Sequence, residues 1–225
     1  SAFNSASVSG YSEQKGKNVK EMLEKCKFTD IQLNDYYKEK PSINSIGACI
    51  GRKDIGDTTL IAVAIRGGGY ESEWAGNFNA YTDGNIHPGF ETAATKVENF
   101  ILEYLSKHDD LIDGRRLKFW VVGYSRAGAT ANLVSAYLGD QSYAEHKDIY
   151  AYTFEAPQPT KKAKYNTNYD YIFNIINPTD IVPKVVMSDW GYARYGQTVY
   201  LPCAYNLSYD KLSKIEQDFR YLLIL

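Results

Sequence analysis

One serine stands where it could act as a nucleophile. Residues 118–132, KFWVVGYSRAGATAN, begin with an apolar run typical of a buried strand, turn sharply through small residues at Ser125, and pass directly into a helix-forming run. Small residues let the strand and the helix approach closely, and the sharp turn presents the serine hydroxyl at the surface. This pattern predicts nucleophilic attack on a carbonyl carbon, with an acyl-serine as the covalent intermediate.

Of the two residues that would activate this serine, the sequence offers a candidate for the acid but none for the histidine that should follow it. After a strand–turn–helix of this kind, the partners follow in the chain order Ser, then Asp or Glu, then His. Asp180 is the best acid candidate because it follows a predicted buried strand, although an Asp before Ile-Val-Pro can also simply cap a turn. All three histidines precede Asp180. The sequence therefore predicts a serine hydrolase without a histidine at the position that the chain order requires.

Alternating apolar patterns predict the elements that position these residues. Short apolar runs predict strands at 45–50, 59–65, 117–122, 149–154, 171–176 and 198–201. Helical spacing of apolar residues predicts helices at 19–26, 88–107, 126–138 and 208–222. The first two strands form a hairpin that leads into the buried part of the sheet. Strands that alternate with helices predict an α/β fold, with a mainly parallel sheet and helices on both faces.

Length and composition bound the class of protein. The 225 residues suit one compact domain at 11–225, preceded by a small, uncharged segment at 1–10 that is a flexible arm or a cloning remnant. A net charge of −2 argues against a nucleic-acid-binding protein. No apolar run approaches the roughly 20 residues that span a bilayer.

The cysteines and histidines do not form a metal-site pattern. Cys26, Cys49 and Cys203 are an odd number without a close pair, which indicates buried free thiols and favours a reducing compartment such as the cytoplasm. His and Cys positions show no zinc-site spacing. We therefore expect neither a metal nor a cofactor.

Six segments, in order, resemble the class 3 lipase family of α/β-hydrolases, and in particular a bacterial lipase-like branch of it. The segments are LIAVAIRGGGYESEWAGNF, IHPGF, VVGYSRAGATANL, YTFEAPQP, NIINPTDIVPKV and WGYARYGQTVYLP, and together they cover about residues 59–196. The resemblance implies an α/β-hydrolase fold and a carboxylic ester or lipid as the substrate.

The same resemblance implies roles for particular residues. Ser125 would be the nucleophile and Asp180 the acid that orients the general base. The backbone amides of Gly68 and Arg126 would form the oxyanion hole, the pair of donors that stabilises the negative charge of the transition state. Ala127 stands where the usual motif has glycine, which is a mild departure. The lid region of the family corresponds here to 75–86, AGNFNAYTDGNI, which is short and polar and favours a small or short-acyl ester.

Three explanations remain open for the missing base. Arg194 lies near the expected histidine position, and a guanidinium stays protonated, so the protein could be an inactive binding protein with a hydrolase fold. An upstream histidine could substitute: His87 lies at a helix start, whereas His108 and His146 lie in polar turns. The base could also lie beyond Leu225, because the chain stops within the apolar run YLLIL without a helix cap. We favour this third explanation.

Overall fold

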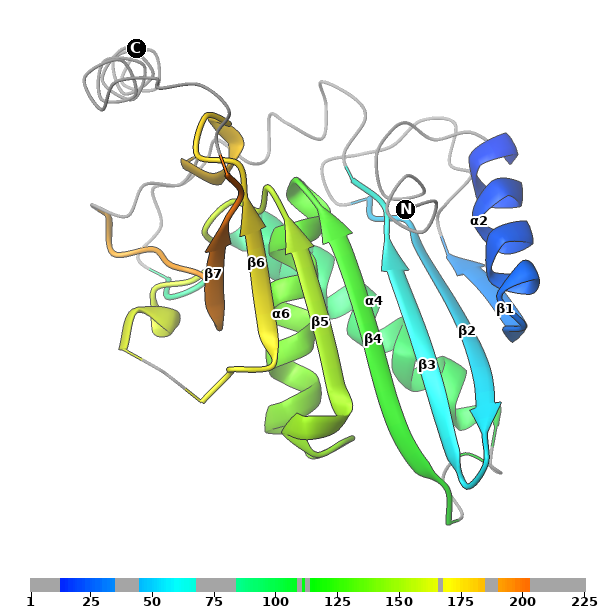
Figure 1. Ribbon diagram of the computed structural model, residues 1–225. Helices are drawn as coiled ribbons and strands as arrows, with labels where there is room; N and C mark the ends of the chain where they lie inside the picture. The colour runs from blue at the N-terminus through cyan, green and yellow to red at the C-terminus, as the bar shows by residue number, and fades with distance from the viewer. Residues whose placement is uncertain are drawn as a thin grey trace.

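The computed structural model describes residues 13–34, 45–67, 84–108, 111, 114–165, 168–184 and 190–202. Within them, seven strands form one sheet, and their order in the sheet is their order in the chain (Figure 1). The strands are β1 (Thr29–Asn34), β2 (Ala48–Ile55), β3 (Thr58–Ile65), β4 (Arg116–Tyr124), β5 (Ile149–Phe154), β6 (Ile172–Ile176) and β7 (Gln197–Tyr200). The expected α/β-hydrolase sheet is confirmed.

The sheet is antiparallel at one side and parallel over the rest. β1 pairs antiparallel with β2, and β2 with β3, whereas β3 to β7 are all parallel. The register brings Ile65 beside Gly123, and Tyr124 beside Phe154. The carboxyl ends of the parallel strands therefore lie at one edge of the sheet, which is the upper edge in Figure 1. Residues that follow β3, β4, β5 and β6 leave the sheet at this edge.

Helices cover both faces of the sheet. α4 (Pro88–Ser106) and α6 (Arg126–Asp140) lie together on one face, behind the sheet in Figure 1. They pack on inward-facing strand residues such as Val63 and Val121. α2 (Glu13–Lys25) packs on the other face, where Leu23 joins the cluster that contains Ala64 and Val122. Successive strand residues point to opposite faces, so both sides of the central strands are apolar.

Three 3-10 helices complete the regular structure of the described residues. They are η1 (His146–Asp148), η2 (Lys162–Tyr165) and η3 (Val182–Lys184). The first of them precedes β5, and the third follows β6 at the edge where the parallel strands end.

Most of the predicted elements are present, and the structure differs from the sequence-based expectations in two respects. β1 was not predicted, because its short sequence TDIQLN carries no clear apolar run. Cys49 is buried as expected, but Cys26 is exposed at the end of α2, so burial of all the thiols is wrong. Burial raises the pKa of the Cys49 thiol to about 12. Cys203 and the helix predicted at 208–222 lie outside the described residues.

Candidate active site

The backbone at Ser125 has the strained geometry of a nucleophile turn. β4 ends at Tyr124 and α6 begins at Arg126, so Ser125 alone connects the strand to the helix. Its φ is 56° and its ψ is −129°, a region that residues other than glycine seldom occupy. Its amide donates a hydrogen bond to the carbonyl oxygen of Phe154, at 2.8 Å. The turn is therefore fixed to the end of the neighbouring strand, β5.

Two glycines allow this turn to close. A Cβ on Gly123 would collide with the carbonyl oxygen of Ala127, the second residue of α6. A Cβ on Gly128 would lie 2.8 Å from the Cβ of Ala156. The helix therefore lies against β4 at the first glycine and against the segment after β5 at the second. The small-residue pattern that suggested the turn in the sequence has this steric cause.

Of the two predicted oxyanion donors, the structure describes only Arg126, at the start of α6. Arg126 occupies the first position of the helix, where backbone N–H groups point out of the helix end and carry its partial positive charge. Its side chain is buried, and Nη1 donates to the carbonyl oxygen of Ser45 at 2.6 Å. The other expected donor, Gly68, lies outside the described residues. β3 ends beside Gly123, so the segment that begins at Arg66 leaves the sheet at the same edge as Ser125.

Ser125 is less accessible than the sequence predicts. The turn was expected to present the serine at the surface, but only 6% of Ser125 is exposed. The segment after β5 packs at this edge, where Ala156 is fully buried and Glu155 is 9% exposed. Ser125 is therefore nearly buried in this structure.

Asp180 lies after β6 at the same edge of the sheet. Its Oδ1 accepts a hydrogen bond from the amide of Val182, at 2.9 Å, so the carboxylate caps η3. This bond uses one of the two carboxylate oxygens, so Asp180 can cap the turn and still accept a bond from a general base. Burial, and then the charges of Asp180 and Glu155, raise the pKa of Tyr124. Both carboxylates therefore act on the residue directly before Ser125.

Glu155 lies at the same edge, and its role there was not predicted from the sequence. It directly follows β5, has a φ of 49°, and its carboxylate accepts hydrogen bonds from the amide of Asn177, at 2.8 and 3.1 Å. Burial raises its pKa, although the bond from Asn177 opposes this. The signal in the sequence was a charged residue at the end of an apolar strand, in the segment YTFEAPQP.

Arg194 also lies at this edge, near the position where a histidine was expected. Its Nη1 donates to the carbonyl oxygens of Ala156 and Pro183, at 2.8 and 2.9 Å. Burial lowers the pKa of the guanidinium to about 10, which still leaves it charged near neutral pH. Arg194 is therefore held by backbone oxygens and has no proton-accepting capacity.

The three histidines occupy structural positions. His87 is fully buried at the N-terminus of α4, where its Nδ1 accepts a hydrogen bond from the amide of Gly89 at 3.2 Å. Nδ1 of His108 lies 2.7 Å from the carbonyl oxygen of Tyr104, after the end of α4. His146 packs against the ring of Tyr171 just before β5. His108 and His146 thus lie at the opposite edge of the sheet from Ser125.

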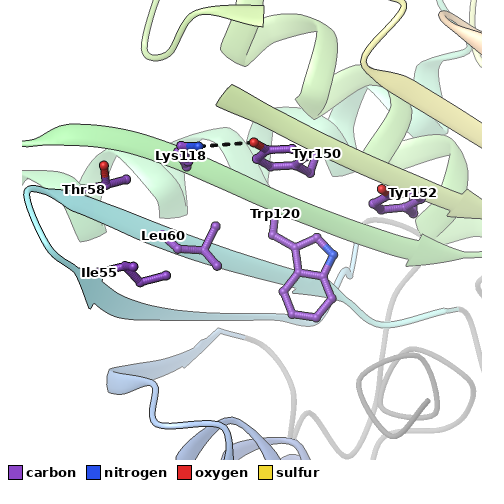
Figure 2. Close-up of a pocket in the computed structure, with 7 residues that line it drawn as sticks. All are labelled: Ile55, Thr58, Leu60, Lys118, Trp120, Tyr150 and Tyr152. Carbon is purple, nitrogen blue, oxygen red and sulfur yellow. Dashed lines mark hydrogen bonds between the residues drawn. The ribbon is translucent and has the colours of Figure 1, made fainter. Parts of the chain in front are cut away.

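A hollow of about 420 Å³ lies on the sheet face, away from this edge. Side chains of β2 to β5 line it, and Figure 2 shows Trp120, Tyr150 and Lys118 among them, with Lys118 donating to the hydroxyl of Tyr150 at 3.3 Å. Trp120 is the lining residue of β4 that is nearest to Ser125 in the chain, and it precedes Ser125 by five residues, roughly 17 Å in an extended strand. The hollow is therefore not part of the site around Ser125.

The fold and the site together define a class. A mainly parallel sheet that carries a strained serine between strand β4 and helix α6 is an α/β-hydrolase with a nucleophile elbow. Residues 62–190, more than half of the chain, match the family model of class 3 lipases. The chain belongs to this family. A comparison with curated proteins found no match.

Solved structures with the same fold include fungal lipases. A mono- and diacylglycerol lipase from Aspergillus oryzae is 24% identical, with 76% of this chain and 64% of that chain covered and a TM-score of 0.57. The triacylglyceride lipase of Rhizomucor miehei is 20% identical, with 77% and 65% covered and a TM-score of 0.55. A lipase from Rhizopus microsporus var. chinensis is 20% identical, with 82% and 64% covered and a TM-score of 0.56. The chain thus spans a little under two thirds of the length of these lipases.

Two further findings concern the described residues alone. None of the helices there has the length and apolar character to cross a membrane. No group of three or more His, Cys, Asp or Glu side chains in this part of the chain is arranged to hold a metal ion.

Proposed function

We propose that this protein hydrolyses carboxylic esters through an acyl-enzyme on Ser125. The observation that carries the proposal is the strained backbone of Ser125, at the N-terminus of α6 and bonded to the end of β5. Strain of this kind costs on the order of 1–3 kcal/mol and persists where the surrounding structure enforces it, often at active sites. Membership of the class 3 lipase family supports the same chemistry.

The proposed reaction has two steps. A general base removes the proton from Oγ of Ser125 as the oxygen attacks the ester carbonyl, and the protonated base then gives that proton to the leaving alcohol. Water hydrolyses the resulting acyl-serine with the help of the same base. The amides of Arg126 and Gly68 would donate hydrogen bonds to the oxyanion. Loss of one such donor typically lowers the rate by about 10²–10³-fold.

We place the general base beyond Leu225. Asp180 would orient it, because the Asp180 carboxylate lies at the edge of the sheet where β4 presents Ser125 and has one oxygen outside its turn-capping bond. Arg194 cannot take this role, since its guanidinium is charged and bonded to two carbonyl oxygens. The alternative, an inactive binding protein, is not favoured by the family match.

The substrate class follows from the relatives and from the sequence of the lid region. Two of the related structures are a mono- and diacylglycerol lipase and a triacylglyceride lipase, so an acyl ester of an alcohol such as glycerol is the starting point. The short, polar segment 75–86 supports a preference for short acyl chains. We further propose a bacterial lipase-like branch of the family, and a cytoplasmic location in keeping with the free thiols of Cys26 and Cys49.

Active-site labelling tests this function. A fluorophosphonate probe should label the intact gene product, and the label should map to Ser125 and disappear in Ser125→Ala. Ser106→Ala is the matched control, because Ser106 is exposed at the end of α4 and should not affect labelling. Labelling that persists in Ser125→Ala, or a wild-type protein that neither reacts nor hydrolyses esters, would contradict the proposal.

A further inference from the structure

Two side chains connect the segment after β5 to the loop that carries Asp180. The first is Glu155, whose carboxylate oxygens accept bonds from the amide of Asn177 at 2.8 and 3.1 Å. A bond from an N–H group to a carboxylate is shorter and stronger than a bond between neutral groups. Glu155 thus fixes the point where the chain leaves β6.

The second connecting side chain is Arg194. Its Nη1 donates to the carbonyl oxygens of Ala156 and Pro183, so one cation holds the segment after β5 against the far end of the loop. The position of Arg194 is itself well fixed. The backbone of Tyr195 bonds to the buried amide side chains of Asn132 and Asn174, on α6 and β6. The guanidinium is therefore anchored to the helix and sheet core.

These contacts lie on either side of Asp180. Asn177 precedes it and is held by Glu155, whereas Pro183 follows it and is held by Arg194. Both contacts are made to adjacent residues, Glu155 and Ala156. These two residues directly follow Phe154, whose carbonyl oxygen accepts the bond from the Ser125 amide. The serine and the acid loop are thus fixed to one short piece of backbone.

We propose that Glu155 and Arg194 are positioning residues that hold the Asp180 loop in register with Ser125. This inference rests on the proposed function and assigns Arg194 a role other than that of a lost histidine. No ion pair joins Arg194 to Glu155 or Asp180 among the described residues; each of the two side chains binds backbone instead. Both hold backbone atoms on either side of the acid, and neither needs to touch the substrate.

The backbone strain and the buried charge of Glu155 indicate that this side chain has a specific role. A buried carboxylate on a residue with a φ of 49° is unfavourable twice, since the charge loses water and the backbone is strained. A glycine would adopt this backbone conformation without strain, but it would leave the amide of Asn177 without the carboxylate. The carboxylate is therefore the feature of Glu155 that the loop requires.

Kinetics on the intact gene product test the inference. Glu155→Ala and Arg194→Ala should lower kcat by about 10–100-fold and leave KM within about twofold, since displacement of a catalytic group by about 1 Å can cost 10²-fold. Glu155→Gln and Arg194→Lys retain an acceptor for Asn177 and a donor for the two carbonyl oxygens, so each should restore much of kcat.

Asp148→Asn is the matched control. Asp148 is a buried carboxylate at the other end of β5, where it accepts bonds from Arg116 at 2.7 and 2.8 Å. Its substitution should lower the melting temperature and leave kcat unchanged. Equal losses of kcat in Asp148→Asn and Glu155→Ala would show a general effect of stability and would overturn the inference.

Hydrogen exchange gives a readout that does not depend on activity. Amides in 177–184 should exchange at least tenfold faster in Glu155→Ala and Arg194→Ala than in the wild type, with no such change in Asp148→Asn. Unchanged exchange overturns the inference even if the wild type proves inactive, in which case the proposed function has failed separately. Faster exchange with an unchanged kcat also overturns it, because the loop would then move without effect on catalysis.

Discussion

The amide of Ser125 donates a hydrogen bond to the carbonyl oxygen of Phe154, at 2.8 Å. This bond continues the pairing of β4 with β5 by one residue beyond the strand, into the turn. Ser125 therefore belongs to the sheet and not to a loose loop. A site built on the end of a strand is positioned by the whole sheet, which catalysis requires because reacting groups must be placed to a fraction of an ångström.

The close approach at Gly123 predicts a large effect of a single methyl group. Gly123→Ala should destabilise the fold by about 3 kcal/mol or more, because the added Cβ would collide with the carbonyl group of Ala127, a backbone group that cannot rotate away as a side chain can. Reversible denaturant unfolding measures the free energy of unfolding.

Gly56→Ala is the control for that substitution. Gly56 lies in the β2–β3 turn with a φ of +63° and no atom within 4 Å of the added Cβ. Gly56→Ala should lower the free energy of unfolding only by the cost of the left-handed backbone conformation, about 1–2 kcal/mol. A Gly123→Ala variant that is as stable as Gly56→Ala would show that helix and strand are less closely packed than described.

The proposed position of the general base predicts that the intact gene product and a chain that ends at Leu225 differ in esterase activity. If the base lies beyond Leu225, the intact gene product should hydrolyse esters, and a chain that ends at Leu225 should retain only the weak activity of the oxyanion hole and binding. This remaining activity can reach about 10³–10⁴-fold over the rate in water. It should vary little near pH 6–7, where a histidine would titrate. Initial rates on an activated ester measure both forms.

Asp180→Asn extends this test. In the intact protein it should lower kcat by about 10²–10⁴-fold, because the general base loses the carboxylate that orients it. In the shorter form it should change little. Equal activity of the two lengths would place the base within the 225 residues, and inactivity of both on every ester tried would favour the binding-protein alternative.

The sequence of the lid region predicts the preferred acyl length. Turnover of p-nitrophenyl acetate or butyrate should exceed that of the palmitate ester, because the segment 75–86 offers little apolar surface for a long chain or a lipid interface. The rates should be compared with and without emulsified substrate. Strong activation on emulsified long-chain esters would contradict this prediction.

The raised pKa of Glu98 predicts that the stability of the fold depends on pH. It lies in a groove between α4 and α6 that Glu91, Asp140 and Lys162 also line. Burial, and then Glu91, raise its pKa from 4.5 to about 7. The native state thus favours the protonated form, so the carboxylate costs nothing below pH 4.5 and destabilises the fold progressively as the pH rises towards about 7.

Glu98→Gln should therefore raise the melting temperature at pH 8 and have little effect at pH 4. Glu98 is only half-buried, so we expect a gain of about 1 kcal/mol, equivalent to roughly 2–4 °C for a domain of this size. Glu103→Gln on the same helix is the control, because Glu103 is exposed and should show no comparable change with pH. The same melting shift at both pH values would exclude the titration of Glu98 as the cause.

The sequence by itself determined most of the helices and strands and the turn that carries Ser125. Apolar runs are local, so β5 at 149–154 and the helix after Ser125 could be predicted from composition and spacing alone. The serine was recognisable for the same reason: the small residues that the turn requires, Gly123 and Gly128, are its neighbours in the chain. β1 was missed because its pairing with β2, and not its own composition, makes it a strand.

The tertiary structure alone brought the supporting residues together. Glu155, Asn177 and Arg194 are far apart in the sequence, and no local pattern indicates that they meet. Parallel pairing of β4, β5 and β6 places the carboxyl ends of these strands side by side, and the residues that follow them meet only there. Local sequence patterns encode helices, strands and turns, because their hydrogen bonds and steric contacts involve near neighbours. The contacts around the Asp180 loop depend instead on the register of the sheet, and this register is set by packing over the whole chain.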